Sequence, residues 1–321
     1  MDLLSGVWCA ANGVCLGVGR TPGDVGAVVV LRANGPVGPV QPVRGTTRLN
    51  EIDCTPGGGC IAVGRGPTGG MVVEIAADGS PGPVRPVPGT TELLDVACPT
   101  ATTCLATGYL WQWPPLAPAS TTTRLFVVIN NGQPAPAQEM RGRGGGAIDC
   151  PSATTCLTFG SSGVVIVTKA DGNWTTTVRR FTSTFPAGHP TGSLSCPSTT
   201  TCYATAAAFI QRPDGYLGVP GMVAVSADGV VGPVQTLHDQ SGNSFDISCV
   251  YVRSCTVVGQ GNFPSTGLII DVFRGTPTLT SWPGHAFFGV SCVGPATCGV
   301  VGSSSESAVF LWHGPVPAVM S

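Results

Sequence analysis

The sequence predicts an all-β fold built from seven similar repeats of one short unit. All 14 cysteines form pairs with five residues between the two members: Cys9 and Cys15, Cys54 and Cys60, Cys98 and Cys104, Cys150 and Cys156, Cys196 and Cys202, Cys249 and Cys255, Cys292 and Cys298. The first cysteines of successive pairs lie 45, 44, 52, 46, 53 and 43 residues apart. A period in this range is typical of architectures that repeat one supersecondary unit.

Each repeat contains four segments with strand character. The first ends at the first cysteine, as in Leu49–Cys54, and the second begins at the second cysteine, as in Cys60–Gly64. The third is the most apolar, as in Met71–Ile75, which suits a strand buried on both faces. A turn such as Asp78-Gly79 follows, for which we expect the type I′ conformation. The fourth segment is rich in proline, as in Gly82–Val87, which predicts an outermost strand because proline cannot donate to a ladder.

Four antiparallel strands per repeat and a period near 45 residues predict a seven-bladed β-propeller. We expect a single propeller domain over residues 1–321, because the repeats run from end to end. The predicted blades cover approximately residues 1–47, 48–91, 92–144, 145–190, 191–243, 244–286 and 287–321. The chain begins at a first strand and ends at a fourth, Pro315–Met320, so each blade is expected to come from one repeat, with little or no strand exchange at closure.

The cysteine spacing favours seven disulfides, each between the first and second strands of one blade. Zinc sites usually place two to four residues between paired cysteines and often add histidines. Here the gap is five, and none of the four histidines lies within a cysteine loop. We therefore expect no metal and no cofactor, and a secreted or extracellular location, where disulfides persist.

The composition excludes two classes of partner. The net charge is -2, so the chain has no basic excess with which to bind nucleic acid. Mean hydropathy is +0.29, but glycine and proline break every apolar run well before the roughly 18 residues that a membrane span needs. We expect neither nucleic-acid binding nor membrane insertion, and we interpret the chain as a mature domain that could be part of a longer polypeptide.

Two motifs carry a resemblance to known propellers. The segment Thr168–Trp174, with Asp171-Gly172 at its centre, resembles an Asp-box of sialidase-like propellers. The Cys-Pro-Ser-x-x-x-Cys frame, found at Cys150–Cys156, is similar to repeats of secreted actinobacterial propellers. Some of those serve as lectin modules, including in umbrella-type toxin particles. The resemblance implies a propeller and carbohydrate binding, but it specifies no ligand.

Variation in loop length predicts where a ligand binds. The disulfide loops have one length, which is typical of a scaffold. From the second cysteine to the turn residue, most repeats take 15 to 19 residues, whereas repeats three and five take 27 and 26. Variable loops on a rigid scaffold commonly bind ligands. The candidate ligand-binding residues in these two long loops are Tyr109, Trp111, Gln112, Trp113, Gln211, Arg212, Asp214 and Tyr216.

The chemistry of these residues favours a sugar. Aromatic rings stack against the C–H faces of sugars, while amide, guanidinium and carboxylate groups bind hydroxyls. The alternative is that Trp111 and Trp113 pack the long loop against its own blade. The predicted function is lectin-like recognition of a cell-surface or cell-wall glycan. A protein-docking module in a secreted complex, bound to other subunits or domains, is the alternative function, because an apolar loop also suits a protein interface.

A glycoside hydrolase is the least favoured function. It would need two carboxylates roughly 5 to 10 Å apart, and the five glutamates share no motif. A sialidase would also need clustered arginines and a Tyr–Glu pair, and no such constellation is visible in the sequence. We therefore expect no enzymatic activity and no catalytic residue.

Overall fold

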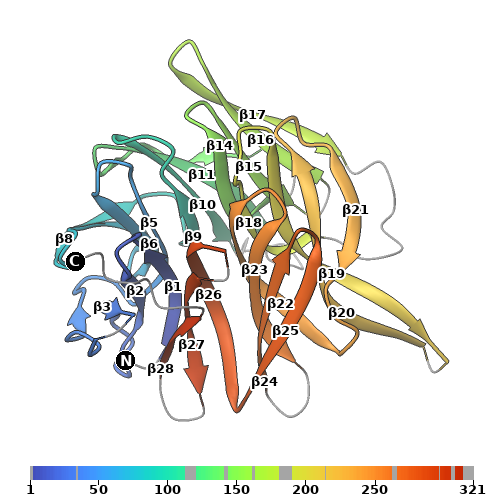
Figure 1. Cartoon of the computed structure of the whole chain (residues 1–321). Coiled ribbons are helices and arrows are strands. Elements are labelled where there is room, and N and C mark those ends of the chain that lie inside the picture. Colours follow the sequence, from blue (N-terminus) through green and yellow to red (C-terminus); the bar gives the residue numbers. More distant parts are fainter. Residues whose placement is uncertain are drawn as a thin grey trace. The chain divides into compact units, whose positions relative to one another are not determined.

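The computed structural model describes residues 3–33, 35–112, 121–140, 144–160, 163–180, 190–213, 215–261, 266–295, 297–304 and 308–313. These residues form seven antiparallel sheets, each made of strands consecutive in the chain (Figure 1). The fold is a seven-bladed β-propeller with four antiparallel strands per blade, as predicted. No helix within these ranges is both long and apolar enough to cross a membrane.

The strands of blades 1 to 4 follow the repeat order. They are β1 (Leu3–Cys9), β2 (Val14–Arg20), β3 (Gly26–Arg32), β4 (Gln41–Pro42); β5 (Arg48–Cys54), β6 (Cys60–Gly66), β7 (Gly69–Ile75), β8 (Pro81–Val87); β9 (Glu92–Ala97), β10 (Thr103–Gln112), β11 (Thr121–Asn130), β12 (Gln133–Pro134), β13 (Gln138–Glu139); β14 (Gly144–Ser152), β15 (Thr155–Gly160), β16 (Gly163–Ala170), β17 (Asn173–Arg180). In blade 3 the two short strands β12 and β13 both pair with β11 and together take the fourth place.

Blades 5 to 7 continue the same order. Their strands are β18 (Pro190–Ser195), β19 (Thr201–Arg212), β20 (Gly215–Ser226), β21 (Val231–Thr236); β22 (Gly242–Tyr251), β23 (Ser254–Gly261), β24 (Thr266–Phe273), β25 (Thr276–Pro283); β26 (His285–Gly294), β27 (Thr297–Ser304), β28 (Ala308–His313). The predicted fourth strand of blade 7, residues 315–320, lies outside the described residues. Among the described strands, none is exchanged between blades.

The chain divides into two compact units. One consists of Met1–Gly17, Val29–Val40 and Thr182–Ser321, and the other of Val18–Val28 and Gln41–Phe181. The first unit holds blades 5 to 7 and part of blade 1, and the second holds blades 2 to 4 and the rest of blade 1. Within the first unit, β1 packs against β26 and β27, so blades 1 and 7 are neighbours.

Burial follows the order of the strands within each blade. The third strands are buried on both faces, as their β-branched runs predict, and the middle of β7 (Met71–Val73) is an example. The fourth strands are largely exposed, as in β8, where two prolines are exposed and a third is half-buried. An edge strand without some backbone donors is a poor template for pairing with another chain.

Each blade carries the predicted disulfide between its first and second strands. The bonded cysteines face each other directly across the strand pair in blades 2, 6 and 7, as Cys54 and Cys60 do. Because each bond closes a short loop, the loss of chain entropy in the unfolded state stabilises the fold by about 2 kcal/mol per bond. All 14 cysteines are used, and none is free.

The turns between third and fourth strands follow the type I′ prediction only in part. Asn131-Gly132 and Asp171-Gly172 have positive φ at both residues, as that turn requires. At Asp78-Gly79 and Asp228-Gly229 only the glycine has a positive φ, so the type I′ prediction is wrong there. In each of these two turns the glycine N–H donates to the carbonyl three residues earlier, which is typical of a type I turn followed by a left-handed glycine.

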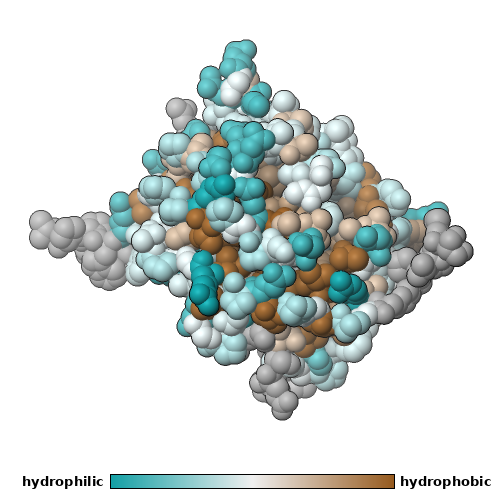
Figure 2. Space-filling view, turned by 90° about the vertical axis from the view of Figure 1, so that its left-hand side faces the viewer, coloured by the Kyte–Doolittle hydropathy of each residue, from teal (hydrophilic) through white to brown (hydrophobic). Residues whose placement is uncertain are grey.

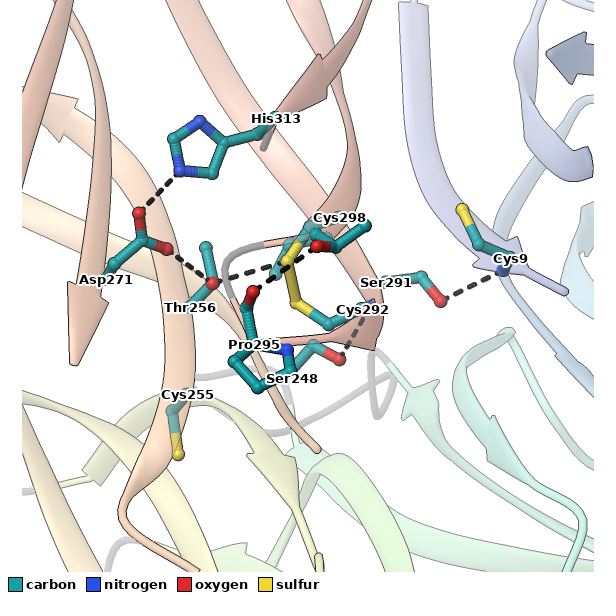
Figure 3. The surroundings of a disulfide bond; sticks show 12 residues. Cys9, Ser248, Cys255, Thr256, Asp271, Ser291, Cys292, Pro295, Cys298 and His313 are labelled. Atoms are coloured by element: carbon teal, nitrogen blue, oxygen red, sulfur yellow. Dashed lines mark hydrogen bonds and ion pairs between the residues drawn. A yellow bond between two sulfur atoms is a disulfide. The ribbon is translucent and has the colours of Figure 1, made fainter. Parts of the chain in front are cut away.

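Side chains of the first strands join neighbouring blades. In the first unit, the hydroxyl of the residue before the first cysteine accepts a hydrogen bond from the backbone N–H of the next blade's first cysteine. The three donor–acceptor pairs are Cys249 to Ser195 at 3.0 Å, Cys292 to Ser248 at 3.0 Å and Cys9 to Ser291 at 2.9 Å. A second contact between blades 6 and 7 joins Asp271 to the Nε2 of His313 (Figure 3).

Aspartates in the first strands play the same part. Asp53 accepts from the backbone N–H of Cys98 at 2.7 Å, and Asp95 accepts from that of Ile148 at 2.7 Å. Asp246 accepts from the N–H of Val290 at 2.7 Å. These carboxylates serve as bridges between blades, where each satisfies a backbone donor of the next first strand.

Candidate functional site

The two long segments predicted as loops are extensions of strands. β10 pairs with β11 out to Gln112 and Thr121, and β19 pairs with β20 out to Arg212 and Gly215. The loop prediction for these residues is therefore wrong. Their aromatic, β-branched and threonine side chains favour extended backbone, and pairing satisfies the backbone groups that a loop would leave to water. The hairpin of β19 and β20 projects beyond the other strands of its blade (Figure 1, yellow).

One side of the β19–β20 hairpin carries exposed aromatic rings. Gln211 faces Tyr216 across the strand pair, and Phe209 faces Gly218. Because side chains alternate along a strand, these four residues lie on the same side. Tyr216 is 72% exposed, and Phe209 and Gln211 are also exposed. Gly218 leaves space beside the Phe209 ring, since a Cβ there would lie 3.7 Å from a ring carbon. We call this surface the blade 5 platform.

The opposite side of the same hairpin is tied to the blade connection. Arg212 donates through Nη2 to the carbonyl of Asp239 at 3.3 Å, so its guanidinium is turned away from the blade 5 platform. Of the four candidate residues in this repeat, the structure brings Gln211 and Tyr216 together and separates Arg212 from them. Asp214 lies outside the described residues. Phe209 was missed as a candidate because the sequence alone does not place it opposite a glycine.

Among the described residues of the β10–β11 hairpin, Trp111 is an exposed tryptophan. Trp111 is 53% exposed, and its backbone N–H donates to the Oγ1 of Thr91 at 2.8 Å. It lies on the same side of the hairpin as Tyr109, two residues earlier, while Gln112 is exposed on the other side. Trp113 lies outside the described residues.

Tyr109 is fixed by a buried carboxylate. The hydroxyl of Tyr109 donates to Glu92 at 2.9 Å. Arg48 binds both oxygens of the same carboxylate, through Nε at 2.6 Å and Nη2 at 2.5 Å, and Asn50 donates to it at 2.7 Å. Arg124 lies over the Tyr109 ring, with Cζ 5.7 Å from the centroid. Tyr109 and Glu92 thus form a pair beside arginines, which is not visible in the sequence.

The electrostatics of this cluster point to a structural role. Burial alone would raise the pKa of Glu92, but the hydrogen bonds from Arg48, Asn50 and Tyr109 outweigh it and lower the pKa below its ordinary value. Burial and the hydrogen bond to Glu92 raise the pKa of Tyr109, which is the opposite of what activates a phenol as a nucleophile. Glu92 is 1% exposed and accepts four hydrogen bonds, so its lone pairs are already used.

Sequence reasoning could not find this cluster. Arg48 and Asn50 lie in the first strand of blade 2, Glu92 in the first strand of blade 3, and Tyr109 in the second strand of blade 3. These residues share no motif, and only the packing of one first strand against the next brings them together. Tyr109 directly faces Glu92 across β9 and β10, and this register is seen only in the structure.

Elsewhere the surface is mixed. On the face shown in Figure 2, hydrophobic residues lie in patches between hydrophilic ones, and the hydrophilic residues are most continuous in the upper part. Exposed apolar area is common on protein surfaces, so it does not select a site on this face. Among the described residues, no three His, Cys, Asp or Glu side chains come together in a way that could hold a metal ion.

Comparison with known proteins supports the fold. No family model matches the chain, and no curated protein matches it. The Pan2 WD40 domain of Neurospora crassa aligns with a TM-score of 0.62 and 10% identity, covering 99% of this chain and 90% of that one. A catalytically inactive virginiamycin B lyase from Staphylococcus aureus, solved with quinupristin, gives a TM-score of 0.60 and 10% identity over 96% of this chain and 94% of that one.

A third solved structure is similar in architecture. The β-propeller domain of the Trilobed protease from Pyrococcus furiosus, described as having an open velcro topology, gives a TM-score of 0.59 and 6% identity. The alignment covers 98% of this chain and 95% of that domain. At such low identities, the likeness shows the fold alone.

Proposed function

We propose that the protein is an extracellular binding module that recognises a cell-surface or cell-wall glycan through the long hairpins of blades 3 and 5. The observation that carries this proposal is the exposure of aromatic rings on the two extended hairpins, Trp111 on one and Phe209 with Tyr216 on the other. The seven disulfides indicate an oxidising compartment, which agrees with an extracellular location.

The blade 5 platform has the chemistry of a sugar site. The rings of Phe209 and Tyr216, which lie diagonally on one side of the hairpin, offer flat apolar faces on which the C–H bonds of a sugar ring can stack. Gln211, between them on the same side, offers both a donor and an acceptor to hydroxyl groups. Because the side chains stand on paired strands rather than on a loop, little ordering is needed when a ligand binds.

The Trp111 surface differs in charge. Arg48 is 41% exposed even while it holds Glu92, and Arg124 lies beside Tyr109 on the same side of the hairpin as Trp111. Arginine binds carboxylate and phosphate groups in a bidentate manner. We therefore expect this hairpin to prefer acidic glycans, and the blade 5 platform to prefer neutral ones.

We propose binding without catalysis. Glu92 is the carboxylate that Tyr109 binds, and its four hydrogen bonds leave it unsuited to act as a general acid or base. Docking of a partner protein on the same hairpins is the second candidate, because exposed tryptophan and tyrosine also mark protein interfaces.

The test is a glycan array that includes neutral and acidic bacterial cell-wall polymers. It compares the native protein with a Phe209→Ala/Tyr216→Ala variant and a Trp111→Ala variant. A matched control is Trp282→Ala, which removes an aromatic ring that is 37% exposed on the outer strand β25. We expect the two hairpin variants to lose binding at least tenfold and the control to keep it. Binding that all variants retain would overturn the assignment of the hairpins, and no binding to any glycan would favour the protein-docking function.

A further inference from the structure

Blade 6 departs from the repeat at its disulfide loop. The five residues between Cys249 and Cys255 are Val250-Tyr-Val-Arg-Ser254. The other six disulfide loops contain neither an aromatic nor a charged residue. The turn after the third strand of blade 6 departs as well, since Arg274 takes the place that asparagine or aspartate holds in five other blades. Both departures lie at the disulfide end of the blade, the end opposite to that of the long hairpins.

The substituted side chains are exposed and lie together. Tyr251 is 61% exposed, Phe273 is 55% exposed, and Val252 is exposed as well. Tyr251 and Phe273 both pair in register with Ser254, so they lie on the same side of the sheet with one strand between them. Arg253 reaches the neighbouring turn, since a Cβ on Gly275 would lie 3.4 Å from its Nη2. We call Tyr251, Val252, Arg253, Phe273 and Arg274 the blade 6 tip.

The blade 6 tip is positively charged and has no internal counterion. Among the described residues neither Arg253 nor Arg274 forms an ion pair, and the guanidinium of Arg274 lies 5.3 Å from the Phe273 ring centroid. The acidic residue on the same strand, Asp271, is already bound to His313 at 2.5 Å and to Thr256 at 2.6 Å (Figure 3). Two unneutralised cations therefore adjoin two exposed aromatic rings in a protein whose net charge is -2.

The backbone at both arginines is unfavourable for their type. Arg253 has a φ of 66° and Arg274 a φ of 52°. The other non-glycine residues with positive φ in the described chain are aspartates and an asparagine, which tolerate that conformation. Blades 1 and 2 have glycine, Gly13 and Gly58, at the loop position that Arg253 occupies. Residues in such unfavourable backbone conformations cluster at functional sites, where the function of the side chain outweighs the energetic cost of the turn.

We infer that the blade 6 tip is a docking site for an acidic segment of a partner protein that also carries an apolar side chain. Tyrosine, phenylalanine and arginine beside valine form the composition typical of protein-interface hot spots. Each arginine can bind a carboxylate in a bidentate manner, and the exposed rings with Val252 can cover an apolar side chain between the carboxylates. This site is separate from the hairpin surfaces and does not depend on glycan binding.

The experiment measures binding of labelled peptides to the disulfide-intact protein by fluorescence anisotropy. The probes are 12-residue peptides in which glutamate and aspartate alternate with leucine and phenylalanine, and matched peptides with glutamine and asparagine in place of the acids. We expect the acidic peptides to bind at least tenfold more tightly than the neutral ones, and to bind more weakly as salt rises.

Two variants test the residues. Tyr251→Ser/Phe273→Thr removes the rings, and Arg253→Gly/Arg274→Asn installs residues that other blades use at these turn positions, so the second variant keeps the fold. Both are expected to reduce acidic-peptide binding at least tenfold. Trp282→Ala, which removes an exposed ring at the opposite end of blade 6, is expected to leave it unchanged.

The contrary outcomes are equally definite. Equal binding of acidic and neutral peptides, no binding of either, or full binding by Arg253→Gly/Arg274→Asn would overturn the inference. If the tip instead binds polygalacturonate or a teichoic acid and not the acidic peptides, the partner is an anionic polymer, and the assignment to a protein is wrong.

Discussion

Asp53 is a carboxyl group that serves as a bridge between two blades. The pKa of Asp53 is raised from 3.8 to about 7, chiefly by burial and in smaller part by the charge of Asp149, against the hydrogen bonds from the N–H groups of Cys98 and Cys54, which lower it. Burial likewise raises the pKa of Asp246, to about 6. Both side chains accept a backbone N–H from the next first strand. Because burial outweighs these hydrogen bonds, the charged forms of both side chains are disfavoured in the folded state.

These two aspartates predict a pH dependence of stability. Because their pKa values are higher in the folded state than in the unfolded state, the folded state binds their protons more tightly. The resulting stabilisation is fully present below the unfolded value of 3.8 and is lost as pH rises through about 6 to 7.

We expect the Tm to fall between pH 5 and pH 8, and calorimetry should find a smaller fall in Asp53→Asn. Asp78→Asn is the control, since this exposed carboxyl has a lowered pKa and stays ionised in that range. An Asp53→Asn slope equal to the native slope would contradict the account.

Replacing the two positive-φ arginines of the blade 6 tip with asparagine or glycine should stabilise the fold. A left-handed conformation costs roughly 1–2 kcal/mol for an ordinary residue, and less for asparagine or glycine. Arg274→Asn and Arg253→Gly should therefore each raise the free energy of unfolding by about 0.5–1 kcal/mol. Urea unfolding measures this, with Arg212→Asn, outside any positive-φ position, as the control. A loss of stability in both variants would contradict the strain described for these turns.

At the scale of elements, the cluster around Glu92 holds three strands together. Arg48 and Asn50 come from β5, Glu92 from β9 and Tyr109 from β10. The carboxylate accepts from all three partners, so its removal leaves the guanidinium and the phenol without this acceptor, while the Asn50 amide keeps its bond to the carbonyl of Leu93. Since Arg48 is partly exposed, water replaces some of what it loses.

We expect Glu92→Ala to lower the free energy of unfolding by about 2–3 kcal/mol, mostly through unsatisfied donors rather than lost Coulomb energy. Glu139→Ala, on the exposed strand β13, is the matched control and should change stability by less than about 0.5 kcal/mol. Chemical denaturation monitored by tryptophan fluorescence distinguishes them. If both substitutions lowered the free energy of unfolding by the same small amount, the cluster around Glu92 would not stabilise the contact between these strands.

The sequence predicted the elements well and their extensions poorly. Cysteine spacing fixed the disulfide hairpins, and the proline content of segments such as Gly82–Val87 placed the outer strands correctly. The long segments of blades 3 and 5 were predicted as loops because length alone was considered. Cross-strand pairing, such as that of Trp111 with Thr122, makes these segments strands. Such pairing depends on the context of the whole sheet and not on the local sequence alone.

Contacts between blades explain the rest of what sequence reasoning missed. Glu92 meets Arg48 from 44 residues away, which no local pattern encodes. The blade 6 tip was overlooked for a different reason, since its disulfide loop has the common length and departs only in composition. Ligand binding stays a prediction for every candidate residue, and Trp113 and Asp214 also lie outside the described residues.

At the scale of the whole molecule, the disulfides supply much of the stability. Seven bonds at about 2 kcal/mol each sum to the order of the total stability of a typical domain, about 5–15 kcal/mol. We expect full reduction to unfold the protein near 37 °C, although its strands are well buried. Circular dichroism with and without a phosphine reductant measures this, with alkylation confirming that all bonds are open. A reduced protein with an unchanged Tm would show that packing alone holds the blades.

The central claim is that the projecting hairpins bind the ligand while the disulfide-bonded sheets carry them. The most direct measurement replaces residues 209–218 with Asn-Gly, which joins Ala208 and Val219 by the kind of turn found at Asn131-Gly132. Glycan affinity and Tm are then measured on the same preparation. We predict that affinity for the neutral glycans bound by the native protein falls below detection, while the Tm changes by only a few degrees. Undiminished affinity in a folded, shortened protein would contradict the account and place the site elsewhere.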